Sequence, residues 1–192
     1  MADSTYKNLM RVAIALTVLW VGWSVYDGFI EKSTPDGQEL AAAFRYLEDG
    51  HYQDALNTYQ SLLKQNPGNT YALRGKAQAL LQLGKFDEAL MAYDEAIYRQ
   101  PDMGVTYANR GILKDRMGDY EGALADYRKA LELEPQVADG PGFMTRFLRN
   151  QAEKPPTVAD RANYLEEQLA KPESQRLLQV PEQDDAQRSY KM

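Results

Sequence analysis

The sequence predicts an all-α protein in which three similar helix pairs stack into a solenoid. Three prolines (Pro67, Pro101 and Pro135) stand 34 residues apart, and several other columns repeat with the same spacing. These columns hold glycine (Gly50, Gly84, Gly118), alanine (Ala55, Ala89, Ala123), leucine (Leu56, Leu90, Leu124) and aromatic residues (Tyr52, Phe86, Tyr120, and Tyr59, Tyr93, Tyr127). A fixed period of this length is typical of repeat architectures, whose stacked units bury a continuous core. The period therefore predicts the fold and directs the question of function toward binding.

Each repeated unit is expected to hold two helices. The units cover residues 36–69, 70–103 and 104–137. The first helix should end at the repeated glycine, which adopts the left-handed conformation at low cost. The second should end before the repeated proline, which cannot continue the hydrogen-bond ladder. The alanine column allows the helices to approach closely, and the column of Tyr59 fills the gap to the next unit.

The third unit shows the pattern most clearly. It reads Tyr107-x-x-Arg110-Gly111, then Gly118-x-Tyr120-x-x-Ala123-x-x-x-Tyr127-x-x-Ala130-Leu131, and ends at Pro135. This pattern resembles the tetratricopeptide repeat, and residues 37–135 resemble three such repeats. The resemblance implies a right-handed solenoid of helix-turn-helix units that serves as an interaction scaffold with many possible clients. The first unit departs most, since Glu39 stands where the family has an aromatic residue.

The N-terminal segment is predicted to form one transmembrane helix over residues 12–30. Residues 12–26 carry no charge and are largely apolar, and a spanning helix needs about 20 such residues. The residues expected at the membrane interface are Arg11, Trp20, Trp23 and Tyr26, because amphipathic rings favour that boundary. Two other interpretations stay open. A cleaved signal peptide lacks its small-residue cleavage site here, and a buried core helix has no place among the repeats.

The flanking charges predict the orientation of this span. Lys7 and Arg11 precede it and Lys32 alone follows closely, so residues 1–11 should be cytoplasmic. In a bacterium the repeats would then lie in the periplasm, on the far side of the inner membrane. Residues 31–36 are polar and turn-forming, and are expected to be a linker between the span and the repeats.

The family resemblance implies a concave groove lined by the first helices of the three units. The groove positions hold Leu40, Phe44 and Leu47 in the first unit, Tyr71, Arg74, Gln78 and Leu81 in the second, and Val105, Ala108, Ile112, Asp115 and Arg116 in the third. Some members of the family clamp a terminal carboxylate with Lys and Asn at set groove positions. Those positions hold Leu40, Phe44, Gly75, Val105 and Asn109 here, so the clamp is absent. The groove is therefore expected to be apolar with two arginines and to bind an amphipathic helix or an extended peptide. Packing of the chain's own C-terminal region against it is the alternative.

The repeat pattern stops after Pro135. Residues 138–170 are expected to form capping helices, one near 142–152 and one that Thr157 caps, because a terminal unit needs its last face covered. A membrane-surface contact is the other interpretation of the first of these segments. Residues 171–192 are expected to be a partly disordered tail.

Composition argues for binding rather than catalysis. The chain carries 22 basic and 28 acidic residues, and the acidic surplus lies on the repeats, which argues against nucleic acid as a partner. With no cysteine and only one histidine, His51, no nitrogen–sulfur metal site is expected. No phosphate-binding loop or catalytic triad is present either. We expect no enzyme activity, cofactor or metal.

The function expected from the sequence is therefore that of a membrane-anchored adaptor. Protein partners would bind in the groove, the lipid bilayer would hold residues 12–30, and the adaptor would assist assembly of a membrane or envelope complex. A permanent accessory subunit docked through its span is the alternative. A third class, an organelle receptor with cytosolic repeats, stays open, as does the oligomeric state.

Overall fold

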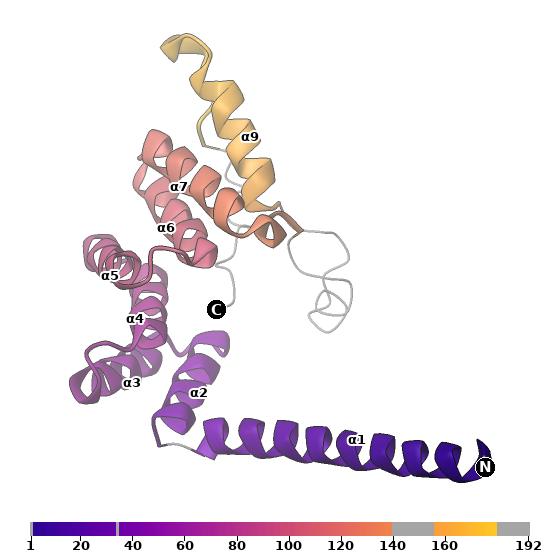
Figure 1. Ribbon diagram of the computed structural model, residues 1–192. Helices are drawn as coiled ribbons and strands as arrows, with labels where there is room; N and C mark the ends of the chain where they lie inside the picture. Colours follow the sequence, from indigo (N-terminus) through magenta and orange to yellow (C-terminus); the bar gives the residue numbers. More distant parts are fainter. Residues whose placement is uncertain (1, 34, 140–155, 180–192) are drawn as a thin grey trace.

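The computed structural model describes residues 2–33, 35–139 and 156–179 (Figure 1). Its α-helices are α1 (Ala2–Ser33), α2 (Pro35–Glu48), α3 (Tyr52–Gln65), α4 (Thr70–Gln82), α5 (Phe86–Arg99), α6 (Gly104–Met117), α7 (Tyr120–Leu133) and α9 (Val158–Leu169). Two short 3-10 helices, η1 (Pro135–Asp139) and η2 (Glu173–Gln175), complete the described elements. The all-helical solenoid expected from the period is confirmed.

Helix pairs α2–α3, α4–α5 and α6–α7 form the three units. Successive first helices contact each other, so α2, α4 and α6 make an inner layer and α3, α5 and α7 an outer layer. Between layers, the alanine column (Ala55, Ala89, Ala123) and the tyrosine column (Tyr59, Tyr93, Tyr127) are almost completely buried. These columns form the continuous core that runs through all three units.

The repeated glycines end the inner helices as predicted. Gly50, Gly84 and Gly118 have φ of 80°, 73° and 81°, the left-handed region in which a side chain is strained. After α4, the amide of Lys85 donates to the carbonyl of Leu80 at 2.9 Å. This bond satisfies a carbonyl that the end of the helix would otherwise leave unpaired. The same bond recurs after α2 and α6, so the three turns share one geometry.

The outer helices end before the repeated prolines. The residues in front of them, Asn66, Gln100 and Glu134, have φ between −141° and −133° and ψ between 80° and 88°. Proline disfavours the helical conformation of the residue before it, so these three residues are extended. Each outer helix therefore stops two residues before its proline.

Helix α9 covers the face of the solenoid that the third unit leaves exposed. It packs on α7, in the place where the first helix of a further unit would lie (Figure 1). Thr157 caps it, because its hydroxyl accepts from the amide of Asp160 while the Asp160 carboxylate accepts from the amide of Thr157. The other expected capping segment, near 142–152, lies outside the described residues.

The N-terminal region differs from expectation. Among the helices that the structure describes, none has both the length and the apolar character needed to cross a membrane, so the expected span at 12–30 is not supported. The expected linker at 31–36 is also mostly helical, since α1 continues to Ser33 and α2 begins at Pro35. Proline fits this place because the first residue of a helix has no hydrogen-bond partner for an amide.

Candidate functional site

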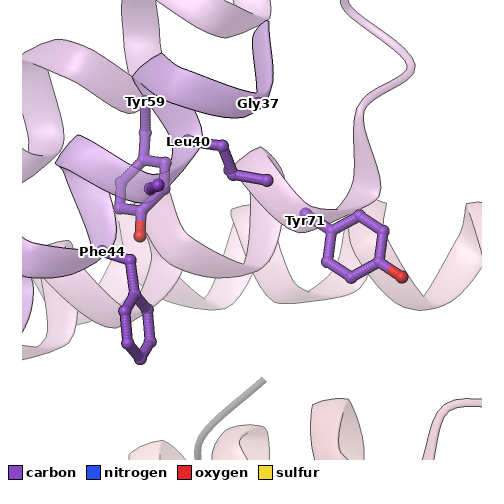
Figure 2. A pocket seen from close by; sticks show the side chains of 6 residues that line it. Gly37, Leu40, Phe44, Tyr59 and Tyr71 are labelled. Carbon is purple, nitrogen blue, oxygen red and sulfur yellow. The ribbon is translucent and has the colours of Figure 1, made fainter. Parts of the chain in front are cut away.

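An apolar hollow lies on the inner layer where the first two units meet. It has a volume of about 230 Å³ and is lined by Gly37, Leu40, Ala41, Phe44, Tyr59 and Tyr71. Figure 2 shows Tyr59 and Phe44 on one side, Tyr71 on the other, and Leu40 between them. The hollow therefore has room for a bulky side chain.

Gly75 allows the Tyr59 ring to form the floor of this hollow. A methyl group at Gly75 would lie 2.7 Å from Cε2 of Tyr59 and even closer to other ring atoms. Only a glycine lets the ring from α3 lie against the backbone of α4. Burial raises the pKa of Tyr59 to about 12, so its hydroxyl stays neutral over the whole physiological range.

Arg74 borders the hollow but is itself buried. Its guanidinium lies 4.7 Å from the centroid of the Tyr71 ring, and its Nη1 donates to Oε1 of Gln100 at 3.4 Å. Burial lowers the pKa of Arg74, and the nearby Tyr71 and Glu134 partly oppose that shift. Arg74 therefore fixes Tyr71 in place and joins α4 to the end of α5.

The third unit carries a buried ion pair at the corresponding part of the inner layer. Arg161 of α9 donates to both carboxylate oxygens of Asp115 of α6, at 2.7 and 2.8 Å. The Tyr127 hydroxyl donates to the same carboxylate at 3.2 Å. Arg161 also donates to the carbonyl of Leu178 at 2.9 Å, so it connects α6, α9 and the chain that follows α9.

The predicted groove residues fall into two groups. Leu40, Phe44, Tyr71, Gln78, Val105 and Arg116 lie on the inner layer and are at least partly exposed. Six others are buried: Leu47, Arg74, Leu81, Ala108, Ile112 and Asp115. Neighbouring units and α9 cover these six side chains, so the exposed part of the inner layer is formed by the first group. Binding by the first group stays a prediction.

The residues expected at a membrane interface lie along α1. Arg11, Trp20 and Trp23 are exposed, the two tryptophans by 71% and 68%, and Tyr26 lies in the same helix. Figure 1 shows α1 extending away from the helix pairs. The apolar side chains described along α1, from Leu9 to Trp23, thus do not join the core of the repeats.

Sequence reasoning missed an ion network between the second and third units. Arg110 donates to Asp94 at 2.6 Å and to both oxygens of Asp126 at 2.7 Å, and Lys114 lies 2.9 Å from Asp126. Burial lowers the pKa of Arg110, but the hydrogen bonds and charges of Asp126 and Asp94 outweigh it and raise the pKa overall. Two basic residues on α6 facing acidic residues of α5 and α7 were the available signal. The network leaves Arg116 as the exposed cation of α6 on the inner layer.

The site offers apolar contacts and fixed charges. In the part of the chain that the structure describes, no group of His, Cys, Asp or Glu is arranged to hold a metal ion. An apolar hollow beside fixed aromatic rings is suited to anchoring a side chain of a protein partner.

Comparison with known proteins identifies the family of the repeats. Models of the tetratricopeptide repeat match residues 40–103 and 105–137. The chain carries tetratricopeptide repeats. This fold is typically a non-catalytic scaffold for protein interactions. No curated protein sequence matched the chain.

Solved structures of similar fold support the same assignment. The first tetratricopeptide domain of Spaghetti (RPAP3), bound to an HSP90 peptide, has a TM-score of 0.56 and 21% identity, covering 71% of this chain and 94% of that one. The tetratricopeptide domain of Sgt2 from Aspergillus fumigatus has a TM-score of 0.53 and 21% identity, covering 72% and 87%. MamA has a TM-score of 0.52 and 21% identity, covering 76% and 87%. These likenesses show the fold alone.

Proposed function

We propose that this tetratricopeptide protein is an adaptor that binds a helical or extended peptide along its inner layer and assists assembly of a membrane or envelope complex. The observation that carries the peptide site is the hollow between α2 and α4. Its walls are Leu40, Phe44 and Tyr71, which are partly or largely exposed and held by a rigid scaffold. The Spaghetti (RPAP3) domain, which has the same fold, is seen with a bound peptide, and this supports the proposal.

The hollow also indicates how the peptide would be held. One bulky aliphatic or aromatic side chain would fill it, and the flanking peptide would run along α4 toward α6. Burying such a side chain is worth about 1.5–3 kcal/mol. In protein interfaces, a few anchoring side chains of this kind supply most of the binding free energy, and the contacts around them contribute little.

A peptide selection tests this site directly. Peptides displayed on phage would be selected on the full chain in mild detergent, and the binding of each selected peptide measured by fluorescence anisotropy. Phe44→Asp combined with Tyr71→Asp should weaken binding at least tenfold, because two carboxylates would then line the hollow. Met91→Asp is the matched control, since Met91 is 73% exposed on the outer helix α5. Equal binding by the two variants would show that the hollow does not hold the peptide.

Attachment at a membrane through α1 is a further part of the proposal. No span is found among the described helices, so this part depends on the sequence and on the exposed apolar side chains of α1. These include Leu16, Leu19 and Trp20, each at least 61% exposed. Attachment would hold the groove close to its partners and raise their effective concentration. The charges near Arg11 favour a cytoplasmic N-terminus and periplasmic repeats in a bacterial inner membrane.

Fractionation and reporter fusions test the attachment. The full chain should sediment with membranes and resist extraction with alkaline carbonate, whereas a chain without residues 1–30 should be soluble. A reporter fused after Met192 should be active only if it acts in the periplasm. Recovery of the full chain in the soluble fraction would refute membrane attachment.

A permanent accessory subunit is the second candidate, favoured by the same exposed surface of α1. In that role α1 would pack against other helices of a larger complex. Replacing residues 1–30 with an unrelated anchor separates the two: an adaptor would keep its partners, while a subunit docked through α1 would lose its complex.

A further inference from the structure

We infer that residues 180–192, called the tail below, bind along the inner layer of the same chain and compete with the partner peptide. This inference rests on the proposed peptide site and adds its regulation. The tail would run from α6 across α4 to the hollow beside α2. Four observations carry it: where the described chain ends, how far the tail reaches, what the tail contains and which charges line its path.

The described chain ends beside the inner layer at the third unit. Residues 171–179 fold back along α9, where the Tyr164 hydroxyl donates to the carbonyl of Leu177 at 2.6 Å. The amide of Leu177 donates to Gln168, and Arg161 holds the carbonyl of Leu178. Because Arg161 also binds Asp115 of α6, the tail starts next to an inner-layer helix.

The tail is long enough to reach the hollow. Thirteen residues follow Gln179 in the sequence. In extended conformation they span roughly 45 Å, at about 3.3–3.6 Å per residue. Packed helices lie about 8–10 Å apart, so the path from α6 to α2 across one intervening helix is roughly 20 Å. About half of the tail is enough to cross it.

Acidic residues and then bulky residues follow each other along the tail, in the order in which their binding partners follow each other along the inner layer. The first half of the tail carries three acidic residues, Glu182, Asp184 and Asp185. The second half carries the bulky Tyr190 and Met192 together with two basic residues, Arg188 and Lys191. From the third unit, the path first meets the exposed cation Arg116 of α6 and then the apolar hollow. Acidic residues would therefore lie near Arg116, and a bulky side chain would arrive at the hollow.

The outer layer offers the tail no comparable path. Helices α5 and α7 carry seven acidic residues (Asp87, Glu88, Asp94, Glu95, Glu121, Asp126 and Glu132) and only three basic ones (Arg99, Arg128 and Lys129). On the inner layer, Arg74 of α4 is buried, and Arg110 and Lys114 of α6 pair with Asp94 and Asp126, whereas Arg116 of α6 is exposed. The acidic first half of the tail is thus repelled by α5 and α7, and Arg116 attracts it to the inner layer. A partner that displaces the tail should share its chemistry, with acidic residues followed by a bulky apolar one.

Disulfide trapping in the full chain tests the inference. The chain has no cysteine, so Ala41→Cys, which lines the hollow, and Ser189→Cys in the tail would introduce the only thiols. A disulfide needs Cα atoms about 4.4–6.8 Å apart, and Met192→Cys paired with Ala41→Cys covers a shift in register. We expect at least one pair to form an intramolecular disulfide at least tenfold faster than the control pair Ala125→Cys and Ser189→Cys. Ala125 is exposed on the outer helix α7.

Two results would overturn the inference. Both hollow pairs could cross-link no faster than the control, or the cross-link could form only between two chains, as covalent dimers on a non-reducing gel. Circular dichroism of each variant before oxidation would establish that the helices are intact.

A competition measurement separates this inference from the proposed function. A labelled peptide of residues 180–192 should bind the chain that lacks the tail at least tenfold more tightly than the full chain, because a tethered segment acts at millimolar effective concentration. Reversing its charges (Glu182→Lys, Asp184→Lys and Asp185→Lys) should weaken binding at least tenfold. If phage-selected peptides bind the hollow but the tail peptide does not, the inference alone fails. If the tail peptide binds but selection on the chain that lacks the tail yields no binding peptide, the proposed adaptor function fails.

Discussion

The two ends of the inner layer are built from equivalent positions and have opposite character. At the hollow end, Tyr59 packs on Gly75 and forms the floor of an apolar cavity with Phe44 and Tyr71. At the ion-pair end, the equivalent Tyr127 donates a hydrogen bond to Asp115, which Arg161 of α9 also binds. Leucines (Leu47 and Leu81) occupy the position of Asp115 in the other two units.

This difference shows that one position of the repeat can hold either an apolar side chain or a buried charge. The charged residue at the third unit is used inside the chain, where it ties the capping helix to the solenoid. The first unit has no capping element on the inner layer among the described residues, and its apolar side chains stay available for a ligand. Each prediction below alters one of these ends.

The largest effect is expected at the ion-pair end. Arg161→Leu leaves the Asp115 carboxylate buried without its guanidinium partner, which costs about 3–5 kcal/mol of unfolding free energy. Arg161→Leu combined with Asp115→Leu should recover most of that loss, since an apolar pair of similar size is often neutral. Urea unfolding followed by circular dichroism measures both. If the double variant is as unstable as the single one, the loss comes from the missing ion pair and not from an unpaired, buried Asp115 carboxylate.

At the hollow end, Gly75→Ala should be the most damaging small change. The added methyl group collides with the Tyr59 ring, and overpacking of this kind costs about 1–3 kcal/mol. The variant should also lose peptide binding, because the floor of the hollow must move. Gly75→Ala with Tyr59→Leu would restore stability but not binding. Unchanged stability in Gly75→Ala would show that the ring does not lie on this glycine.

Alkaline pH should weaken the hollow end through Tyr59. Its pKa is about 12 in the folded chain against about 10 when unfolded, so the unfolded state loses its proton first as pH rises. The stability contributed by the neutral hydroxyl is fully present below pH 10 and is lost between about pH 10 and 12. The loss over this whole range should amount to about 2.7 kcal/mol, at about 1.4 kcal/mol for each unit of pKa. Tyr59→Phe should lack this part of the decline in urea unfolding at pH 9 and 11.5, and parallel declines would contradict the assignment.

The smallest effect is expected at the surface of the ion-pair end. Arg128 of α7 pairs with Glu166 of α9, but both side chains are more than half exposed. Arg128→Ala should therefore lower the unfolding free energy by no more than about 1 kcal/mol, and less in high salt. Comparing it with Arg161→Leu separates the effect of burial from that of the ion pair, because both join the solenoid to α9. A loss as large as that of Arg161→Leu would show that α9 is held mainly by its surface.

The repeat period predicts most of the fold. Local rules place the glycine turns at Gly50, Gly84 and Gly118, and the prolines end the outer helices, so three helix pairs follow from spacing alone. The beginning of α2 was missed because a polar segment with Pro35 reads as a turn, although proline is also favoured at a helix start.

The site was predicted less well, for two physical reasons. A column identifies which way a side chain points from its helix but not what covers it, so Leu81 and Ile112 were expected in the groove and are buried. The partner of Asp115 lies 46 residues further along the chain, beyond the end of the period, where no repeat rule applies. Interactions of that kind follow from three-dimensional packing and have no local signal.

The contact of Tyr59 with Gly75 also has a consequence for how such a gene can change by recombination. Tyr59 belongs to the first unit and Gly75 to the second, so this contact joins two neighbouring units. Deleting the second unit, residues 70–103, would leave the first and third units intact but place Asn109, which carries a Cβ, under Tyr59 in place of Gly75. Tyr127 instead packs on Gly111 within its own unit, where a methyl group would lie 2.6 Å from its ring. The units are thus not interchangeable, because the contacts between neighbouring units fit only in the present order.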